Sequence, residues 1–458
     1  MITNKRIYII IFTAFTLSLI TSFIFVKNFD RYEISTDVKE NHAMIKGDIP
    51  DMWIDAQIIK NDLSNGKSYF ESGNEIFRSY LPPRSFALFS YIFNYELFEN
   101  WEKKIFSIDN KKIYFLFLQS IFYFFSLVIL FKEIKKHYEV KTCFFIICFL
   151  SFEPTVFFYH SSFHTESIFF TMQVIMLTML INNYEKLIKF IGIGILLGFM
   201  FLQKLVAIYY IIPISIYYIV KLRKKVLLPL LTILVFYSLI IFLVGYGNYK
   251  RSNIFYFMPP SSKITLHLYF PSSIISKAEK IDEEIVSKKV EEDRIKWIKD
   301  NNINLNLESD RIKYYNYLQK YTLKILLKYP ITTFKFITWR TLQTGILNPA
   351  YIYQFYSNEI EKKPPYYLEE RYQKINIPIN IIYSIIIYLI IFYGFFTSLK
   401  KIKVEQIILL VLSSAYMLGL LGWANNSRYF VPSLIYLSIF WGHGISNLSK
   451  LKNKNQTN

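Results

Sequence analysis

Three aspartates lie within eight residues near the start of the chain, in the stretch GDIPDMWIDA that begins at Gly47. A carboxylate held near lipid headgroups can act as a general base that takes a proton from an attacking hydroxyl or amine. The residues from 53 to 60 suit a helix on a membrane surface, on which Asp51 and Asp55 would share a face. Asp48 would precede this helix and point at a ligand. The alternative interpretation is a solvated loop in which Asp51 caps the helix.

Membrane helices must position these acids. The chain has 458 residues, of which 53% are hydrophobic and only 19% charged, and its mean hydropathy is +0.26. A soluble protein has about 25% charged residues, and a helix needs roughly 20 apolar residues to cross a bilayer. The composition excludes a soluble enzyme, a disulfide-stapled secreted domain and a disordered chain. The sequence predicts an all-α polytopic membrane protein with about ten transmembrane helices, at residues 7–26, 113–131, 142–159, 167–182, 188–202, 205–220, 226–246, 378–398, 405–422 and 429–446.

The basic residues in the short loops predict the orientation. Eighteen lysines and arginines fall in the two termini and the alternate loops, whereas the opposite short loops hold only Lys204 and Arg428. Basic loops stay in the cytoplasm. We therefore expect a multi-pass protein of the cell (inner) membrane with both termini in the cytoplasm. The formal net charge of +19 forms no single patch with interleaved aromatic residues, so we expect no nucleic-acid partner.

This topology divides the chain into three parts. Residues 1–246 form an N-terminal module of seven helices with a first outer loop at 27–112, residues 247–377 form an extracytoplasmic segment, and residues 378–458 form three helices and a cytoplasmic tail. The outer segment contains a charged stretch at 276–300 that predicts a solvated amphipathic helix, with a partner-binding surface as the alternative.

A second helical pattern at 314–347 is broken at Tyr329-Pro330. We expect its second half to lie at the membrane interface, with Trp339 as a belt residue. None of the predicted spans carries Asp, Glu, Lys or Arg at its centre, which argues against an ion-coupled transporter and places the chemistry at the outer surface.

The first outer loop resembles that of the glycosyltransferase C superfamily, in the branch of protein O-mannosyltransferases and lipid A aminoarabinose transferases. Members of that branch place an acid, often Asp-Glu, after the first membrane helix, followed by an aromatic residue and by Ala eight positions after the Asp. The matching residues here are Asp48, Trp53 and Ala56, followed by Gly66-Lys67-Ser68-Tyr69 and Tyr80-Leu81-Pro82-Pro83. Ile49 replaces the second acid, which leaves the acceptor class open and lets Asp51 compete for the catalytic role.

Further short elements resemble the same superfamily in the same order and on the same side of the membrane. They are Glu153-Pro154 followed by His160, His164, Thr165 and Glu166; Gln203-Lys204, where relatives often carry Arg-Pro; Asn248-Tyr249-Lys250-Arg251; and Asn425 to Pro432 around Arg428. From the residues alone, Glu166 at a helix N-terminus and Lys204 at a membrane edge also suit structural roles. His164 suits a hydrogen bond to the neighbouring carboxylate.

The resemblance implies that a sugar moves, with inversion, from a polyprenyl-phosphate donor to a surface glycan, lipid or protein on the outer face. It implies Asp48 or Asp51 as the general base, with donor-binding residues Arg84, His164, Glu166, Lys204, Arg251 and Arg428. A monophosphate leaving group met by basic side chains could make a divalent metal unnecessary, and the sequence indicates no cofactor and no metal ligands.

Two other activities are alternatives. A flippase or exporter of lipid-linked saccharide would need polar residues along a path through the membrane, which the uncharged span centres disfavour. An O-antigen-type polymerase would act on diphosphate-linked oligosaccharide. Such proteins typically carry their largest catalytic loop late in the chain, and the early segment from Asp48 to Pro83 argues against that class.

Overall fold

The computed structural model describes most of the chain. The described residues are 3–27, 31–33, 48–69, 72–73, 80–94, 96–97, 105–107, 110–160, 166–258, 263, 267, 270–305, 307–346, 370–421 and 431–455. They fold into α-helices, with two 3₁₀ turns and one short antiparallel pair of strands. In that pair β1 (Arg31–Glu33) aligns with β2 (Ile105–Ser107), and Tyr32 lies opposite Phe106.

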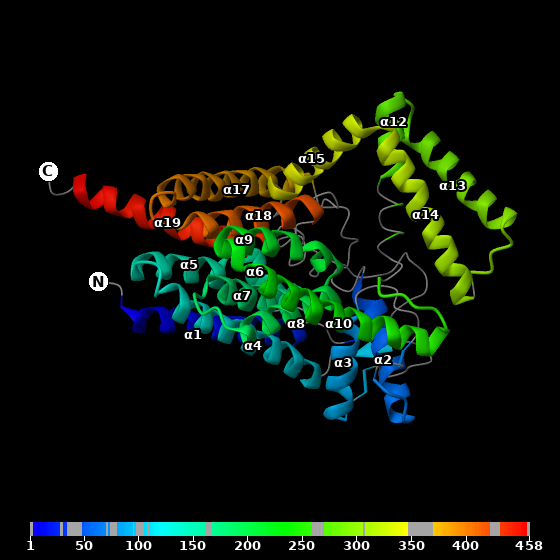
Figure 1. Ribbon diagram of the computed structural model, residues 1–458, viewed down its shortest axis with the longest axis horizontal. Coiled ribbons are helices and arrows are strands. Elements are labelled where there is room, and N and C mark those ends of the chain that lie inside the picture. Colours follow the sequence, from blue (N-terminus) through cyan, green and yellow to red (C-terminus); the bar gives the residue numbers. More distant parts are fainter. Residues whose placement is uncertain are drawn as a thin grey trace.

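Long apolar helices form a bundle (Figure 1). In it α8 packs on α10, α4 packs between α1 and α7, and α19 packs against α5, α17 and α18. Its helices are α1 (Asn4–Lys27), α4 (Asn110–Ile134), α5 (Val140–Phe152), α6 (Pro154–His160), α7 (Glu166–Ile181), α8 (Leu187–Gln203), α9 (Ile211–Leu222), α10 (Leu227–Ser252), α17 (Glu370–Ser398), α18 (Val404–Leu421) and α19 (Val431–Asn455).

Each predicted membrane run coincides with a helix, so the all-α polytopic class is confirmed. Within the described residues, five helical stretches are long and apolar enough to cross a membrane: Asn4–Phe23, Ile113–Ile134, Leu205–Lys225, Leu227–Ser252 and Ile381–Ser398. The predicted runs at 142–159, 167–182, 188–202 and 405–422 contain shorter apolar helices. The run at 142–159 is two helices, because Pro154 cannot continue α5 and instead opens α6. The helix predicted from 378 begins earlier, at Glu370, and continues through Pro378.

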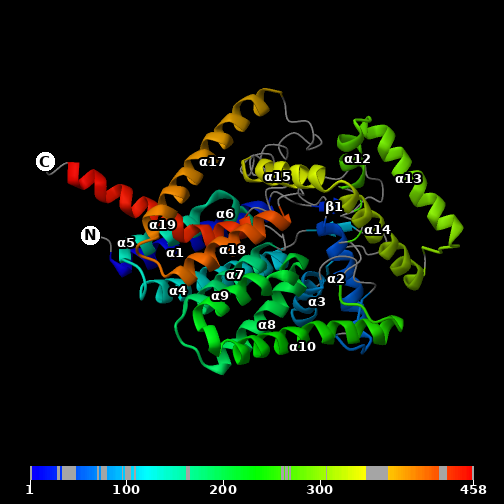
Figure 2. The same cartoon turned by 45° about the horizontal axis from the view of Figure 1, so that its top comes forward.

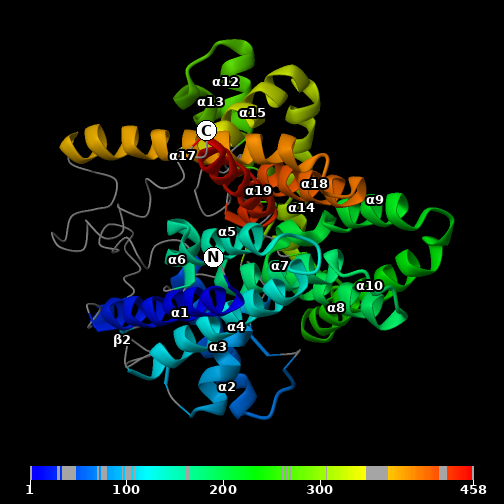
Figure 3. The ribbon, with the colours of Figure 1, turned by 90° about the vertical axis from the view of Figure 1, so that its left-hand side faces the viewer.

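The polar helices lie at one end of the bundle and the chain termini at the other. Figures 1 and 3 show α1 beginning and α19 ending at the same end, opposite α2 (Asp48–Ser64) and α3 (Leu81–Ile92). The helices α12 (Pro271–Glu279), α13 (Glu283–Asp300) and α14 (Glu308–Lys328) also lie beyond the end that holds α2 and α3 (Figure 2). Segments far apart in the sequence therefore gather at this end, which we call the α2 end.

The second polar segment differs in one respect from its prediction. The single helix expected over 276–300 is two helices, α12 and α13, separated by Lys280 in the left-handed conformation. Asp282 then caps α13 by accepting a hydrogen bond from the backbone N–H of Glu284 at 2.8 Å. The predicted break at Tyr329-Pro330 is confirmed, since α14 ends at Lys328 and α15 (Pro330–Ile346) begins at Pro330.

Glycines allow α17 and α19 to approach closely. A Cβ atom added at Gly394 would collide with the backbone carbonyl of Phe440, and one added at Gly444 would collide with the carbonyl of Ile390. Membrane helices lack the hydrophobic driving force of soluble ones and associate through such small-residue contacts. The packing of α17 on α19 therefore depends on residues without side chains.

We predict that Gly394→Ala destabilises the protein, because the added methyl group forces α17 away from α19. Overpacking of this kind costs about 1–3 kcal/mol. The matched control is Gly419→Ala in α18, where an added Cβ has no described atom within 4 Å. Thermal unfolding in detergent should show a lower midpoint for Gly394→Ala than for Gly419→Ala. Equal midpoints would show that this close approach is not required.

Candidate functional site

The acidic stretch begins a helix. The structure starts α2 at Asp48, so Asp48 and Asp51 both belong to its first turn. The prediction that Asp48 precedes a helix of residues 53–60 is therefore wrong. Acidic residues at a helix N-terminus are stabilised by the backbone dipole, which explains why the helix extends this far. The side chains of Asp48 and Asp51 lie outside the described part of the structure.

An aromatic cluster holds α2 in place. Trp53 is almost fully buried and packs against Phe86 of α3, with their ring centroids 6.0 Å apart. Phe86 stacks in turn on Phe115 of α4 at 4.2 Å. Ala56 and Ile59 complete the buried face of α2. This packing fixes the acidic end of α2 relative to the beginning of a membrane helix.

Arg84 lies buried beside α2, in the first turn of α3. It is only 2% exposed, its guanidinium group lies 3.7 Å from the centre of the Tyr80 ring, and Nη2 donates a hydrogen bond to the Ser72 carbonyl at 2.8 Å. Burial lowers the pKa of Arg84, and the neighbouring groups Tyr80, Tyr69 and Asp55 oppose this shift. Asp55 on α2 and Arg84 on α3 therefore interact electrostatically across the two helices.

The loop after α2 brings Tyr69 to the same place. Asp62 accepts hydrogen bonds from Lys67 at 2.7 Å and from the backbone N–H of Gly73 at 2.8 Å, which closes this loop. Gly73 has a φ of 90°, and a Cβ there would lie 2.7 Å from Ile59, so only glycine fits. Burial raises the pKa of Tyr69 to about 12, with the Arg84 charge opposing it. Tyr69 therefore stays a neutral hydroxyl.

Lys204 and Glu166 form a buried ion pair. Lys204 Nζ lies 2.7 Å from Glu166 Oε1, and the exposed fractions of the two side chains are 11% and 2%. Glu166 is the first residue of α7 and Lys204 follows the last residue of α8, so each charge lies at the end of a helix. Lys204 is thus an ion-pair partner rather than a snorkelling anchor, and the pair ties α7 to α8 at the α2 end.

Arg251 links the end of α10 to the second polar segment. Its Nη2 lies 3.0 Å from Oε1 of Glu308, the first residue of α14. The Tyr256 hydroxyl also donates to this carboxylate oxygen, at 2.7 Å, and contacts Nη2 of Arg251. Asn248 donates to the Tyr256 carbonyl at 2.5 Å, which holds the turn after α10. The sequence did not identify Glu308 or Tyr256, because 57 residues separate Glu308 from Arg251.

The structure brings together two of the predicted donor-binding cations, Arg84 and Arg251. The charge of Arg251 lowers the pKa values of Arg84 and Tyr80, so these three groups are neighbours. Lys204 follows α8 at the same end of the bundle and contacts Glu166. Two predicted residues, His164 and Arg428, lie outside the described residues. Among the residues that the structure does describe, no group of three His, Cys, Asp or Glu side chains could hold a metal ion.

One buried acid qualifies the prediction of uncharged spans. Glu153 lies at the break between α5 and α6, inside the predicted run 142–159, and is 3% exposed. Its carboxylate accepts hydrogen bonds from the backbone N–H of Val156 at 2.8 Å and from the Thr155 hydroxyl at 3.1 Å. These contacts cap α6. Glu153 therefore has a structural function: its carboxylate replaces the backbone hydrogen bonds that are missing at the helix break.

The apolar bundle with charges at its ends defines an integral membrane protein. Residues 102–246 match the sequence model of the family described as dolichyl-phosphate-mannose-protein mannosyltransferase. The matched stretch runs from α4 into α10 and contains Glu166 and Lys204. The resemblance to the protein O-mannosyltransferase branch is confirmed for this part of the chain. A comparison with curated protein sequences finds no match.

Solved structures of an archaeal oligosaccharyltransferase and of ArnT align with nearly all of the chain. The archaeal oligosaccharyltransferase AglB from Archaeoglobus fulgidus, in complex with an inhibitory peptide and a dolichol-phosphate, has 9% sequence identity and a TM-score of 0.42 over 98% of this chain and 51% of that chain. The apo form of the Archaeoglobus fulgidus oligosaccharyltransferase has 11% sequence identity and a TM-score of 0.48, over 98% of this chain and 51% of that chain. ArnT from Cupriavidus metallidurans, bound to undecaprenyl phosphate, has 10% sequence identity and a TM-score of 0.36, over 94% of this chain and 76% of that chain. The chain spans about half the length of the first two.

We predict that Lys204→Met lowers the free energy of unfolding by about 3–5 kcal/mol, because it leaves the buried Glu166 carboxylate uncompensated. The double variant Lys204→Met/Glu166→Gln removes both charges and should recover part of this loss. Denaturant unfolding in detergent measures both effects.

The matched control for this pair is Lys288→Met, which removes an exposed ion pair with Glu284. Exposed pairs contribute less than about 1 kcal/mol, so this variant should unfold like the wild type. If Lys204→Met were no more destabilising than Lys288→Met, the buried pair would not hold α7 to α8.

Proposed function

We propose that this protein is a glycosyltransferase that moves a sugar from a polyprenyl-phosphate donor to a surface glycan, lipid or protein on the extracytoplasmic face. The observation that carries the proposal is the gathering of Arg84, Lys204 and Arg251 at the end of the bundle where α2 begins with its acidic turn. The family match over residues 102–246 supports the same class of reaction.

The proposed orientation follows from the positions of the termini and the polar helices. With the basic loops in the cytoplasm, the end that holds the termini faces the cytoplasm of a cell (inner) membrane. The α2 end then faces outward, with the outer loop 27–112 in the N-terminal module 1–246 and the outer segment 247–377 before the C-terminal part 378–458. Figure 3 is consistent with this arrangement, since both termini face the viewer.

The leaving group would be a polyprenyl monophosphate, whose charge grows as its bond to the sugar breaks. Arg84 is suited to meet this charge, because its Nε–H is buried and has no hydrogen-bond partner among the described residues. Charge-assisted hydrogen bonds from guanidinium groups to phosphate are strong and stabilise the departing oxyanion. Lys204 and Arg251 would add positive charge from positions fixed by Glu166 and Glu308. His164 and Arg428 remain proposed donor-binding residues.

The general base would be Asp48, with Asp51 as the alternative. Asp48 lies seven residues, about two turns, before Asp55, so the two positions share a face of α2. Asp55 interacts electrostatically with Arg84. Asp48 also lies four residues before the buried Met52, so this face turns toward the protein. Asp51 lies four residues before Asp55 and shares this face too. The choice of Asp48 therefore rests on its spacing to Trp53 and Ala56, which matches the superfamily that the first outer loop resembles.

The proposed reaction is a single displacement. The acceptor oxygen or nitrogen attacks the anomeric carbon of the donor as the bond from that carbon to the phosphate oxygen breaks. The acceptor proton passes to the carboxylate base, and polyprenyl phosphate leaves as the anion. One displacement inverts the configuration at the anomeric carbon.

We predict that Asp48→Asn lowers sugar transfer at least about 100-fold, the contribution expected of a general base. The measurement is transfer by the full chain, reconstituted with polyprenyl-phosphate sugars and with surface glycan from a deletion strain as acceptor. Mass spectrometry of that strain's surface first identifies the sugar that is lost. Asp51→Asn is the matched control from the same helical turn and should retain activity within a few fold.

Three results would contradict parts of this proposal. Full activity of Asp48→Asn with loss in Asp51→Asn would assign the base to Asp51 instead. Full activity of both variants would remove the first turn of α2 from the mechanism. Movement of lipid-linked sugar across reconstituted vesicles without formation of a new glycosidic bond would replace the transferase with a flippase.

A further inference from the structure

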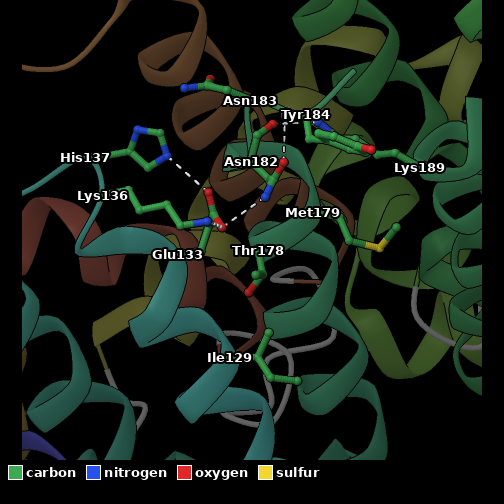
Figure 4. A pocket seen from close by; sticks show the side chains of 10 residues that line it. All are labelled: Ile129, Glu133, Lys136, His137, Thr178, Met179, Asn182, Asn183, Tyr184 and Lys189. Carbon is green, nitrogen blue, oxygen red and sulfur yellow. Dashed lines mark hydrogen bonds and ion pairs between the residues drawn. The ribbon is translucent and has the colours of Figure 1, made fainter. Parts of the chain in front are cut away.

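A second polar site lies at the opposite end of the bundle from α2. It is a pocket of about 770 Å³ between the end of α4, the end of α7 and the start of α8 (Figure 4). Its charged and polar lining includes Glu133, Lys136, His137 and Lys189. None of these residues belongs to the candidate transferase site, so the pocket needs a separate explanation.

The walls of the pocket change from apolar to polar within one helical turn. On α4, Ile129 precedes Glu133 by four residues, and at the end of α7, Met179 is followed by Asn182 and Asn183. Residues four apart lie above one another on a helix, about 6 Å along its axis. Glu133 and Asn182 are hydrogen-bonded to each other, so both walls turn from apolar to polar at the same level. This change is what the boundary between hydrocarbon and headgroups requires of a membrane protein.

The polar side chains of the pocket are paired with one another. Glu133 accepts hydrogen bonds from Lys136 at 2.7 Å and from Asn182 at 2.9 Å, and His137 lies 3.3 Å from it (Figure 4). Lys189 donates to the carbonyl of Asn182 at 2.6 Å. The side chains that could meet a ligand are thus held in place before it binds, which lowers the entropic cost of binding.

The pocket carries excess positive charge. Its lining holds two lysines, Lys136 and Lys189, against one glutamate, Glu133. The Glu133 carboxylate already accepts hydrogen bonds from Lys136 and Asn182. The net positive charge of the lining favours an anionic ligand.

We propose that this pocket binds the phosphate headgroup of an anionic phospholipid in the leaflet at the termini end of the bundle. The lipid phosphate would lie between Lys136 and Lys189, and its acyl chains would follow Ile129 and the exposed apolar residues Leu187 and Ile188 toward the hydrocarbon. Basic pockets between membrane helices recognise anionic headgroups in this way. The apolar wall distinguishes a lipid from a free phosphate ion.

The test is native mass spectrometry of the full chain in neutral detergent, titrated with phosphatidylglycerol, phosphatidylcholine or inorganic phosphate. The wild type should retain one phosphatidylglycerol in preference to phosphatidylcholine. Lys136→Gln should bind phosphatidylglycerol about 5-fold more weakly, the effect of one lysine near an anionic headgroup. Lys136 is exposed and Glu133 keeps its other partners, so this variant should fold.

Two further variants separate the remaining outcomes. Lys135→Gln is the matched control, because Lys135 is exposed, lies over the Phe131 ring and does not line the pocket. It should bind phosphatidylglycerol like the wild type. Ile129→Trp should weaken phosphatidylglycerol binding but not the binding of inorganic phosphate.

Equal loss in Lys136→Gln and Lys135→Gln, or equal binding of the two lipids, would overturn the proposal. Displacement of phosphatidylglycerol by an equal concentration of inorganic phosphate would assign the pocket to a soluble anion instead. None of these results depends on sugar transfer, so the pocket and the transferase are tested independently.

Discussion

The hydrocarbon interior of a bilayer leaves few arrangements open to a charged or polar group. Backbone groups there must bond within helices, and side-chain charges must move to the ends or find partners. This constraint explains why Glu166 and Lys204 lie at the ends of α7 and α8 and why they pair with each other. It also explains why the acid inside a predicted span, Glu153, lies where a helix breaks and its carboxylate can replace missing backbone bonds.

The same constraint separates the molecule into two polar ends with different contents. The α2 end carries an acidic helix start, aromatic side chains around Arg84, and cations fixed by carboxylates from distant parts of the chain. The termini end carries lysine-rich loops around a pocket. A reaction between a lipid-linked sugar and a water-borne acceptor needs the first kind of end, where charge can be stabilised beside the membrane. Retention of a lipid needs only the second kind of end, with basic side chains around a pocket.

The sequence predicted the helices well because bilayer thickness sets the length of each apolar run, and that length can be read from the run alone. It predicted boundaries less well: α2 begins at Asp48 rather than near Trp53, and α17 begins before Pro378, because helix ends depend on capping and packing. It identified Arg84, Lys204 and Arg251 as cations at the outer helix ends and loops. It could not supply their partners, since Lys204 meets Glu166 across 38 residues and Arg251 meets Glu308 across 57.

Thiol labelling in intact cells tests whether α2 lies on the extracytoplasmic side. Asn65 directly follows α2 and Lys135 directly follows α4, and both are exposed. The turn after α4 lies at the termini end, where Glu139 pairs with Lys450 of α19. The native Cys143 is buried and Cys148 is half-buried. The wild-type chain therefore measures the background labelling of these two thiols. A membrane-impermeant maleimide should label Asn65→Cys in intact cells and Lys135→Cys only after lysis. Labelling of Lys135→Cys but not Asn65→Cys in intact cells would place the acidic turn in the cytoplasm and contradict the account.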